Sequence, residues 1–332
     1  MTPRISVLMP CFNHGSFITE AIQSVLAQTF QDFEIIVVDD GSTDPETTTV
    51  LANLAMPKTT VLKTSNQGLP AARNHAARQA TGQLLCALDA DDKLAATWFE
   101  KGVRVLDAHP ELAFVSHWLE TFGDEHWTWT PERCDLSSLL ARNTVNGAAL
   151  VRRQAFEAVG GYDSSMREGC EDWDFWLRLV EHGFEGTIIP EVLFYYRRRA
   201  DSMSREMLDR ERYRRPLETL FAKHEQAYRA QLPEIFAAKA AEAQHLIEEI
   251  ATIERDRVLS LQPALRRARE ELAAIAAKAE RARIDQERKE QLDRLTWKAA
   301  ELEREVADLR SSWSWRVTAP LRKLYSLLRS GS

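Results

Sequence analysis

The stretch "LLCALDADDKL", residues 84–94, joins an apolar run to three carboxylates. The run has the length and composition of a buried strand, and Asp89, Asp91 and Asp92 follow it directly. Carboxylates this close repel one another unless a cation, a partner group or water offsets their charge. Aspartate also favours solvated loops and helix N-termini. The stretch alone therefore allows a ligand site or an ordinary loop, and the surrounding sequence decides between them.

Strand and helix patterns alternate on both sides of this stretch, over residues 1–115. Helix-like periodicity separates the apolar runs, and one such segment places Phe17, Ile22 and Leu26 on a single stripe. Strands spaced by helices predict an α/β fold with a mostly parallel sheet and helices on both faces. The predicted strands lie at residues 5–10, 33–44, 60–64 and 83–88, and the predicted helices at 16–29, 45–55 and 66–80.

Three of the predicted strands end in polar clusters. These clusters are Pro10–Asn13, Asp39–Asp44 and Asp89–Asp92. In open α/β sheets, ligands bind beyond the carboxyl ends of the strands. The convergence of three polar clusters at one edge of the sheet therefore favours a ligand site over a solvated loop.

The composition divides the chain into four segments. Residues 116–205 are rich in aromatic side chains and are expected to complete one domain, 1–205, and to close over the site. From residue 206 glycine is absent until Gly331, and Ala, Glu, Arg and Leu dominate. The expectation is a helical connector at 206–232, a coiled-coil or long helical region at 233–312 and a basic, aromatic, amphipathic tail at 313–332.

The long helical region carries apolar residues at a spacing of three and four. One set includes Leu246, Ile250 and Ile253, and the pattern is interrupted at Pro263 before it resumes. This heptad-like pattern, with dense mixed charge elsewhere, predicts a coiled coil and self-association through it. A solvated single helix and an intramolecular helical hairpin are the alternatives.

The tail contains four basic residues and no acidic one, together with Trp313, Trp315 and Tyr325. Such a segment suits the interface of an anionic membrane. A terminal helix that packs on its own domain or on a partner is the alternative.

The overall composition limits the function classes. The 332-residue chain has a net charge of −7, which argues against general nucleic-acid binding. Its four cysteines have no CxxC spacing and are read as reduced thiols. The first residues show no signal-peptide pattern, and no stretch has the roughly 18 apolar residues of a spanning helix. We expect a cytoplasmic protein, with peripheral contact to the inner face of the cell membrane through the tail.

Residues 1–205 resemble a family-2 glycosyltransferase of the GT-A fold, which has a Rossmann-like sheet. The opening strand, first helix and second strand resemble that family in "ISVLMPCFNHGSFITEAIQSVLAQTFQDFEIIVVDDGSTD". "NQGLPAARNHAARQATGQLLCALDADD" resembles the segment that ends in its DxD metal motif, and "GGYD" followed by "CEDWDFWLRL" resembles its acceptor-side segment. The resemblance covers about three-fifths of the chain and says little about the sugar.

The resemblance implies roles for the polar clusters. Asp89 and Asp91 become candidate ligands of Mg²⁺ or Mn²⁺, with Asp92 as a candidate third, since hard cations prefer oxygen ligands and leave positions for phosphate. The nucleotide-sugar donor would also contact Asp89. The other residues expected at the donor are Pro10, Asp39, Asp40, Arg73 and Arg199.

Family-2 enzymes of this kind invert the anomeric centre, so one carboxylate must remove the proton of the acceptor hydroxyl. The resemblance places Asp172 in this role, with Glu171 as the second candidate and Asp174 as the third. An acidic first helical turn that only stabilises the helix is the alternative. Arg199 stands where the family often has a histidine near the metal, and an arginine can hold phosphate but cannot ligate a cation.

Together these observations predict an inverting glycosyltransferase that moves a sugar from a nucleotide-diphosphate sugar to a growing glycan or lipid-linked saccharide in bacterial surface polysaccharide assembly. The main alternative is a non-catalytic assembly scaffold with a degenerate glycosyltransferase domain. A nucleotidyltransferase is disfavoured because "MPCFNHGSF" lacks a glycine-rich basic loop. A dinucleotide oxidoreductase is disfavoured because no GxGxxG follows any strand.

Overall fold

The computed structural model describes residues 2–199, 210–281 and 286–311. The chain divides into two compact units, Met1–Phe236 and Ala237–Ser332. The segment expected to be a connector, 206–232, therefore belongs to the first unit.

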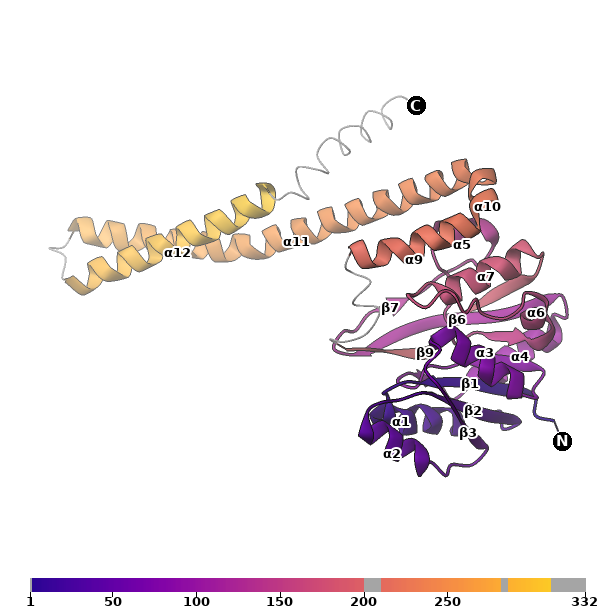
Figure 1. Cartoon of the computed structure of the whole chain (residues 1–332). Coiled ribbons are helices and arrows are strands. Elements are labelled where there is room, and N and C mark those ends of the chain that lie inside the picture. Colours follow the sequence, from indigo (N-terminus) through magenta and orange to yellow (C-terminus); the bar gives the residue numbers. More distant parts are fainter. Residues whose placement is uncertain (1, 200–209, 282–285, 312–332) are drawn as a thin grey trace. The chain divides into compact units, whose positions relative to one another are not determined.

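The first unit is built on one mixed sheet (Figure 1). Its strand order is β3-β2-β1-β4-β8-β6-β9-β5, and β7 pairs with β6. The first four strands in this order are mutually parallel, as the sequence predicts. Beyond β4 the sheet is mixed, because β8 is antiparallel to both of its neighbours while β6 and β9 are parallel. The strands are β1 (Ile5–Cys11), β2 (Phe33–Asp40), β3 (Thr59–Thr64), β4 (Leu84–Ala87), β5 (Lys93–Leu94), β6 (Leu112–Gly123), β7 (Thr128–Trp129), β8 (Leu150–Arg152) and β9 (Glu185–Arg198).

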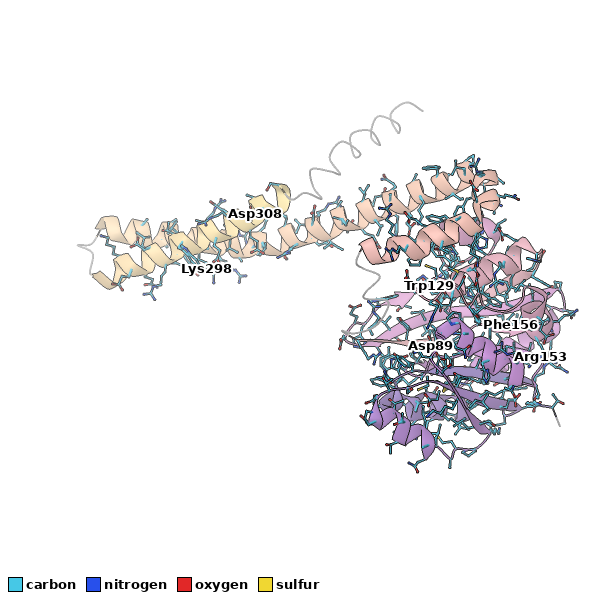
Figure 2. All side chains as sticks on the ribbon, viewed as in Figure 1. Asp89, Trp129, Arg153, Phe156, Lys298 and Asp308 are labelled. Atoms are coloured by element: carbon cyan, nitrogen blue, oxygen red, sulfur yellow. The ribbon has the colours of Figure 1, made fainter. Side chains whose placement is uncertain are left out.

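Helices cover both faces of this sheet. Successive residues of β1 point to opposite faces, so Val7 and Met9 join one apolar cluster and Leu8 joins the other. The first cluster includes residues of α1 (Gly15–Leu26), α2 (Pro45–Ala52) and α4 (Trp98–Ala108). The second includes residues of α3 (Leu69–Gln79), α5 (Leu136–Ala141), α6 (Arg153–Ala158) and α7 (Glu171–Glu181), with Phe156 of α6 labelled in Figure 2.

Two further helices pack on the apolar cluster that contains α3, α5, α6 and α7. α9 (Arg210–Lys223) places the fully buried Leu220 in the cluster that contains α7. α10 (Glu225–Ala230) adds the partly buried Tyr228 to the same cluster. The connector expected from the sequence thus contributes to the core around α7.

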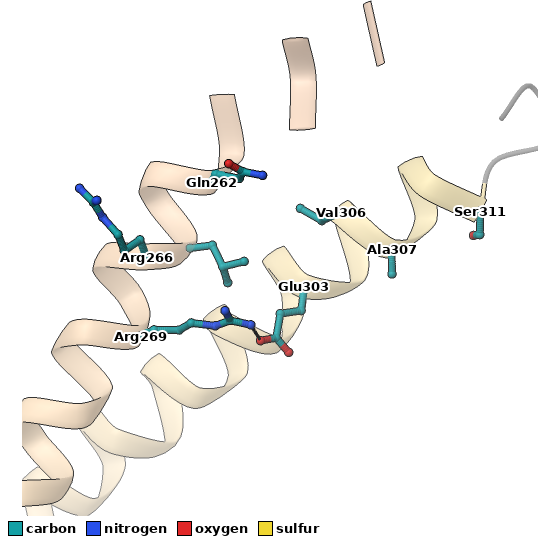
Figure 3. Close-up of a pocket in the computed structure, with 8 residues that line it drawn as sticks. Gln262, Arg266, Arg269, Glu303, Val306, Ala307 and Ser311 are labelled. Carbon is teal, nitrogen blue, oxygen red and sulfur yellow. Dashed lines mark hydrogen bonds and ion pairs between the residues drawn. The ribbon is translucent and has the colours of Figure 1, made fainter. Parts of the chain in front are cut away.

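The second unit contains a helical hairpin formed by most of α11 (Leu232–Arg281) and by α12 (Gln286–Ser311). Ala268 of α11 and Ala299 and Val306 of α12 are buried. Figure 3 shows the ion pair between Arg269 and Glu303 that joins the two helices. Of the arrangements open from the sequence, this is the intramolecular hairpin, and self-association stays a prediction.

Two features of α11 differ from the simple coiled-coil pattern. The helix continues through Pro263, where the apolar pattern is interrupted. Leu246, Ile250 and Ile253 remain 50%, 39% and 66% exposed. The later part of α11 therefore packs against α12, whereas the earlier apolar residues of α11 face solvent.

In the described ranges, no helix combines the length and apolarity needed to cross a membrane. The tail predicted to contact a membrane, residues 313–332, lies outside the described residues.

Candidate active site

A cleft of about 730 Å³ opens where the carboxyl ends of β1, β2 and β4 meet the N-terminus of α7. Asp89 and Trp129, both labelled in Figure 2, contribute to its lining. The side along the strand ends, with Pro10, Asp40, Asp89 and Asp91, is termed the strand wall. The side at the first turn of α7, with Glu171 and Asp172, is termed the helix wall. All six of these residues line one cleft, although they are distant in the sequence.

The aspartates that end β2 organise the loops of the strand wall. Asp40 accepts hydrogen bonds from the backbone N–H groups of Gln67 and Gly68, at 2.9 and 2.8 Å. Asp39 accepts one from the backbone N–H of Ser42 at 2.9 Å. Both aspartates are buried. Their carboxylates therefore fix the loops around the cleft, in addition to any contact with a nucleotide.

Arg73 joins the two walls. Its guanidinium donates hydrogen bonds to Glu171 at 2.7 Å and to Asp89 at 2.8 Å. Only 4% of its side chain is exposed. Burial opposes its charge, yet attraction to Asp89 and Glu171 raises the pKa of Arg73 well above its usual value. The structure thus places Arg73 inside the site rather than on a helix surface, as a fixed cation between two carboxylates.

The turn after β4 carries the remaining strand-wall carboxylates. Asp91 lies 3.3 Å from the guanidinium of Arg199 and 3.9 Å from the imidazole of His14. Burial raises the pKa of Asp91, and repulsion from Asp89 adds to the increase, while His14 and Arg199 oppose it. Asp91 therefore sits in a place where additional positive charge would stabilise its ionised form.

Asp92 has a different environment from Asp91. It is 2% exposed and accepts a hydrogen bond from the backbone N–H of Arg197 at 2.8 Å. Burial and repulsion from Asp91 and Asp89 raise its pKa well above the ordinary value. One oxygen of Asp92 thus holds β9 against the turn that carries the other two aspartates.

The strand wall offers a divalent cation an open set of ligands. Asp89 and Asp91 line the cleft and supply hard oxygen ligands, which suit Mg²⁺ or Mn²⁺. Among the residues the structure describes, no three His, Cys, Asp or Glu side chains gather as a group that could hold a metal. A cation held by these two carboxylates would have to take its other oxygen ligands from a bound ligand and water.

The helix wall presents Asp172 with neutral hydrogen-bond donors. Asp172 accepts one hydrogen bond from the side-chain amide of Asn143 at 3.1 Å and one from the backbone N–H of Trp173 at 2.7 Å. Burial, together with repulsion from Glu171, raises its pKa to about 7, while Arg73 lowers it. A carboxylate with this pKa can accept a proton near neutral pH.

A strained turn positions this carboxylate. Cys170 precedes α7 with φ of 61°, in the left-handed region that non-glycine residues seldom adopt. Gly169 before it has φ of 118°. Such strain persists only where the surrounding structure enforces it, and it is common beside functional groups.

Other side chains of α7 serve packing and charge pairing. Trp176 is fully buried, and the indole N–H of Trp173 donates to the carbonyl of Leu139 at 2.6 Å. Asp174 is also fully buried, where it pairs with residues of α7 and α9 and with His224, between α9 and α10. Asp174 lies two residues from Asp172, on another side of the helix.

The structure adds residues that sequence reasoning missed, notably His14, Asn143 and the cleft-lining Trp127. His14 could have been found, because it follows β1 at the edge where ligands bind. Asn143 has no local signal, since it approaches Asp172 from a segment 29 residues away. Trp127 belongs to the aromatic-rich segment that the sequence predicts to close over the site, although no feature of the sequence distinguishes this residue within it.

Family models and a relative in Bacillus subtilis all match this chain to glycosyltransferases. The glycosyl transferase family 2 model matches residues 6–168, and a model for glycosyltransferase-like family 2 matches residues 127–254. The Bacillus subtilis (strain 168) protein EpsE, named as a glycosyltransferase, is 30% identical over 216 residues. That alignment covers 61% of this chain and 76% of EpsE.

Solved structures share the fold. The mannosyltransferase PcManGT from Pyrobaculum calidifontis, in complex with GDP-Man and Mn²⁺, has a TM-score of 0.53 and 23% identity, covering 74% of this chain and 76% of that one. Staphylococcus aureus TarS 1–349 in complex with UDP-GlcNAc has a TM-score of 0.51 and 22% identity, covering 61% of each chain. The present chain thus spans about three-fifths of the TarS chain it matches.

Proposed function

Because the chain belongs to glycosyltransferase family 2, we propose that its cleft transfers a sugar from a nucleotide-diphosphate sugar to an acceptor hydroxyl with inversion at the anomeric carbon. One observation carries this proposal. Asp172, whose pKa is raised to about 7, shares a cleft with the strand-wall carboxylates Asp89 and Asp91. The arrangement supplies a base on one side and a place for the donor on the other.

In the proposed reaction, ionised Asp172 removes the proton of the acceptor hydroxyl as its oxygen attacks the anomeric carbon. The bond from that carbon to the diphosphate breaks as the new glycosidic bond forms, so the nucleotide diphosphate leaves with the electron pair. General-base assistance of this kind contributes roughly 10²–10⁴-fold to a rate. Glu171 stays paired with Arg73 and thereby leaves Asp172 as the acceptor of the proton.

Asp89 and Asp91 would hold Mg²⁺ or Mn²⁺, which would neutralise charge on the departing diphosphate. The Mn²⁺ in the Pyrobaculum mannosyltransferase structure supports a cation in this fold. Arg199 and His14, beside Asp91, would lie next to the same phosphates. A guanidinium cannot ligate a cation but binds phosphate directly. This assigns Arg199 to the diphosphate.

The proposed acceptor is a glycan or lipid-linked saccharide in bacterial surface polysaccharide assembly, on the cytoplasmic side of the membrane. Trp127 is 45% exposed and lines the cleft with Trp129, where aromatic faces could stack on a sugar. Self-association and contact of the tail with the membrane belong to the same proposal. The exposed Leu246, Ile250 and Ile253 of α11 are available apolar residues for self-association.

The proposal is tested by calorimetric titration with UDP-, GDP-, dTDP- and CDP-sugars, first with Mn²⁺ and then with EDTA. We expect one nucleotide class to bind the wild type with Mn²⁺ and to bind Asp91→Ala at least tenfold more weakly. Asp107→Ala is the matched control, because Asp107 is half exposed and pairs with Arg4 instead of lining the cleft.

Each other outcome has a distinct meaning. Binding that survives EDTA would assign the diphosphate to Arg73 and Arg199. Absence of binding by every donor, with both Mn²⁺ and EDTA, would contradict the proposal and favour the non-catalytic scaffold.

A further inference from the structure

The far side of α7 contains a cluster of charges, centred on a buried aspartate, that the proposed reaction does not use. Asp174 is fully buried on this helix. Its carboxylate lies 2.6 Å from the ammonium of Lys223, 2.8 Å from the guanidinium of Arg178 and 3.2 Å from the imidazole of His224. Arg178 belongs to α7 itself, whereas Lys223 and His224 come from the junction of α9 and α10. The cluster therefore ties α7 to residues about 50 positions later in the chain.

The same junction holds both ends of α7. Lys223 also pairs with Asp163, in the loop that leads into the helix. His224 also pairs with Glu181, the last residue of the helix, at 2.8 Å. Leu220, one turn before this junction, is fully buried in the cluster that contains Phe175 and Trp176. Polar and apolar contacts thus fix α7 from one short segment.

Charge pairing outweighs the effect of burial on the pKa values in this cluster. Burial raises the pKa of Asp174, but hydrogen bonds from His224 and Lys223 and the charge of Arg178 lower it overall. Burial lowers the pKa of His224, but its bonds to Asp174 and Glu181 raise it above the ordinary value. Loss of Lys223 or His224 would leave the buried carboxylate of Asp174 with fewer compensating charges, which favours a displacement of the helix.

We propose that Lys223 and His224 are positioning residues for Asp172, so that the helical segment after residue 209 sets the placement of the proposed catalytic base. This rests on the proposed function. Asp172 stands in the first turn of α7, two residues before Asp174, and a rigid helix transmits a displacement of one to the other. A misplacement of about 1 Å can cost on the order of 100-fold in rate.

The charge cluster contacts the helix that carries Asp172 and not the strand wall where the donor is proposed to bind. The strand wall, with Pro10, Asp40 and Asp91, lies on other elements and makes no described contact with Lys223 or His224. Breaking the cluster should therefore lower the transfer rate and leave donor affinity unchanged. A purely structural cluster would lower stability without changing the titration of Asp172.

The test measures the protonation of Asp172 directly, without any substrate. The full-length protein is labelled with ¹³C at aspartate carboxyl carbons, and the Asp172 signal is identified by its loss in Asp172→Asn. Its titration is compared among wild type, Lys223→Met and His224→Gln. The titratable or charged groups that also interact with Asp172 are Glu171, Arg73, Tyr162 and Cys170. Arg178 also pairs with Asp174, while Asp163 and Glu181 pair with Lys223 and His224. None of these groups other than Lys223 and His224 is altered in the variants.

We expect the Asp172 midpoint to move from its wild-type value in both variants. Leu217→Ala is the matched control, because Leu217 of α9 packs on the apolar cluster that contains α7 and bears no charge. It should lower the melting temperature and leave the midpoint unchanged. An unchanged midpoint in Lys223→Met and His224→Gln would overturn the inference.

A kinetic measurement adds a second readout once a donor is known. Both variants should reduce turnover about tenfold or more with donor affinity unchanged, and equal losses of affinity and turnover would contradict the inference. Failure of the wild type to bind or turn over any donor would count against the proposed function alone, since the carboxyl titration does not depend on it.

Discussion

The two walls of the cleft place the same residue type in opposite environments. On the strand wall, Asp89 pairs with Arg73 at 2.8 Å and Asp91 lies 3.3 Å from Arg199. On the helix wall, Asp172 accepts hydrogen bonds from neutral groups, and the guanidinium of Arg73 pairs with Glu171. Cations beside Asp91 oppose the burial that raises its pKa, whereas burial and a carboxylate neighbour raise the pKa of Asp172 to about 7. This difference in environment underlies the proposal that one wall binds the donor and the other removes the proton.

The comparison is tested most strongly by Asp172→Asn. The amide cannot accept the proton of the acceptor, so we expect transfer to fall by about 10³-fold, within the range for loss of a general base. Donor affinity, measured by calorimetry, should stay within a factor of two or so of wild type. Transfer of sugar by Asp172→Asn at the wild-type rate would show that Asp172 is not the base.

Substitution of Arg73 breaks the link between the walls. Arg73→Met leaves Glu171 and Asp89 without their shared cation, and removal of one partner from a buried pair costs about 3–5 kcal/mol. Chemical denaturation should show this loss, and Arg73→Lys should recover only part of it, because one ammonium cannot span both carboxylates as a guanidinium does. Wild-type stability in Arg73→Met would show that the walls are held together by other contacts.

The pH dependence of turnover sharpens the same contrast. Because the base must be ionised, turnover in the wild type should rise as pH increases through about 7, the pKa of Asp172. At pH 6 it should be about tenfold below its plateau. A profile that is flat between pH 5.5 and 8.5 would exclude Asp172 as the rate-determining base.

The same carboxyl group should make the folded protein less stable as pH rises from about 4 to about 7. The folded protein holds the proton of Asp172 up to about pH 7, whereas the unfolded chain releases it near pH 4. Between these values the native state binds more protons, so this group makes stability fall as pH rises. Asp172→Asn should remove that decline, which thermal melting at pH 5 and pH 7.5 would reveal.

The smallest effect is expected far from either wall. The pair between Arg269 and Glu303 joins the helices of the hairpin, and both side chains are at least half exposed. Removing it with Arg269→Ala should change the stability of the hairpin by less than about 1 kcal/mol. Donor binding and turnover should be unchanged, and a change in either would mean that the hairpin influences the cleft.

Much of the strand wall follows from local sequence pattern. The apolar runs, the intervening helical periodicity and the aspartates at strand ends predict the parallel strands β1 to β4 and the edge where Pro10, Asp40, Asp89 and Asp91 gather. Each of these signals lies within a few residues of its consequence. This is why a single sequence suffices for them.

The rest depends on contacts between distant segments. The pairing of Arg73 with Glu171 spans 98 residues, and nothing near Arg73 indicates that it is buried. The order of the strands beyond β4 and the contact of His224 with Asp174 likewise arise from tertiary packing. The 3–4 spacing of the long helices fits a hairpin as well as a coiled coil between chains, because both bury the same kind of seam.

The most direct test of the division between the walls uses the nucleotide sugar that the wild type binds. Its affinity and its conversion to nucleotide diphosphate are measured on the same samples of Asp172→Asn and Asp91→Ala. We expect Asp172→Asn to bind the donor as the wild type does without turning it over, and Asp91→Ala to lose binding. Loss of donor binding in Asp172→Asn, or unimpaired turnover by it, would contradict this division of roles between the walls.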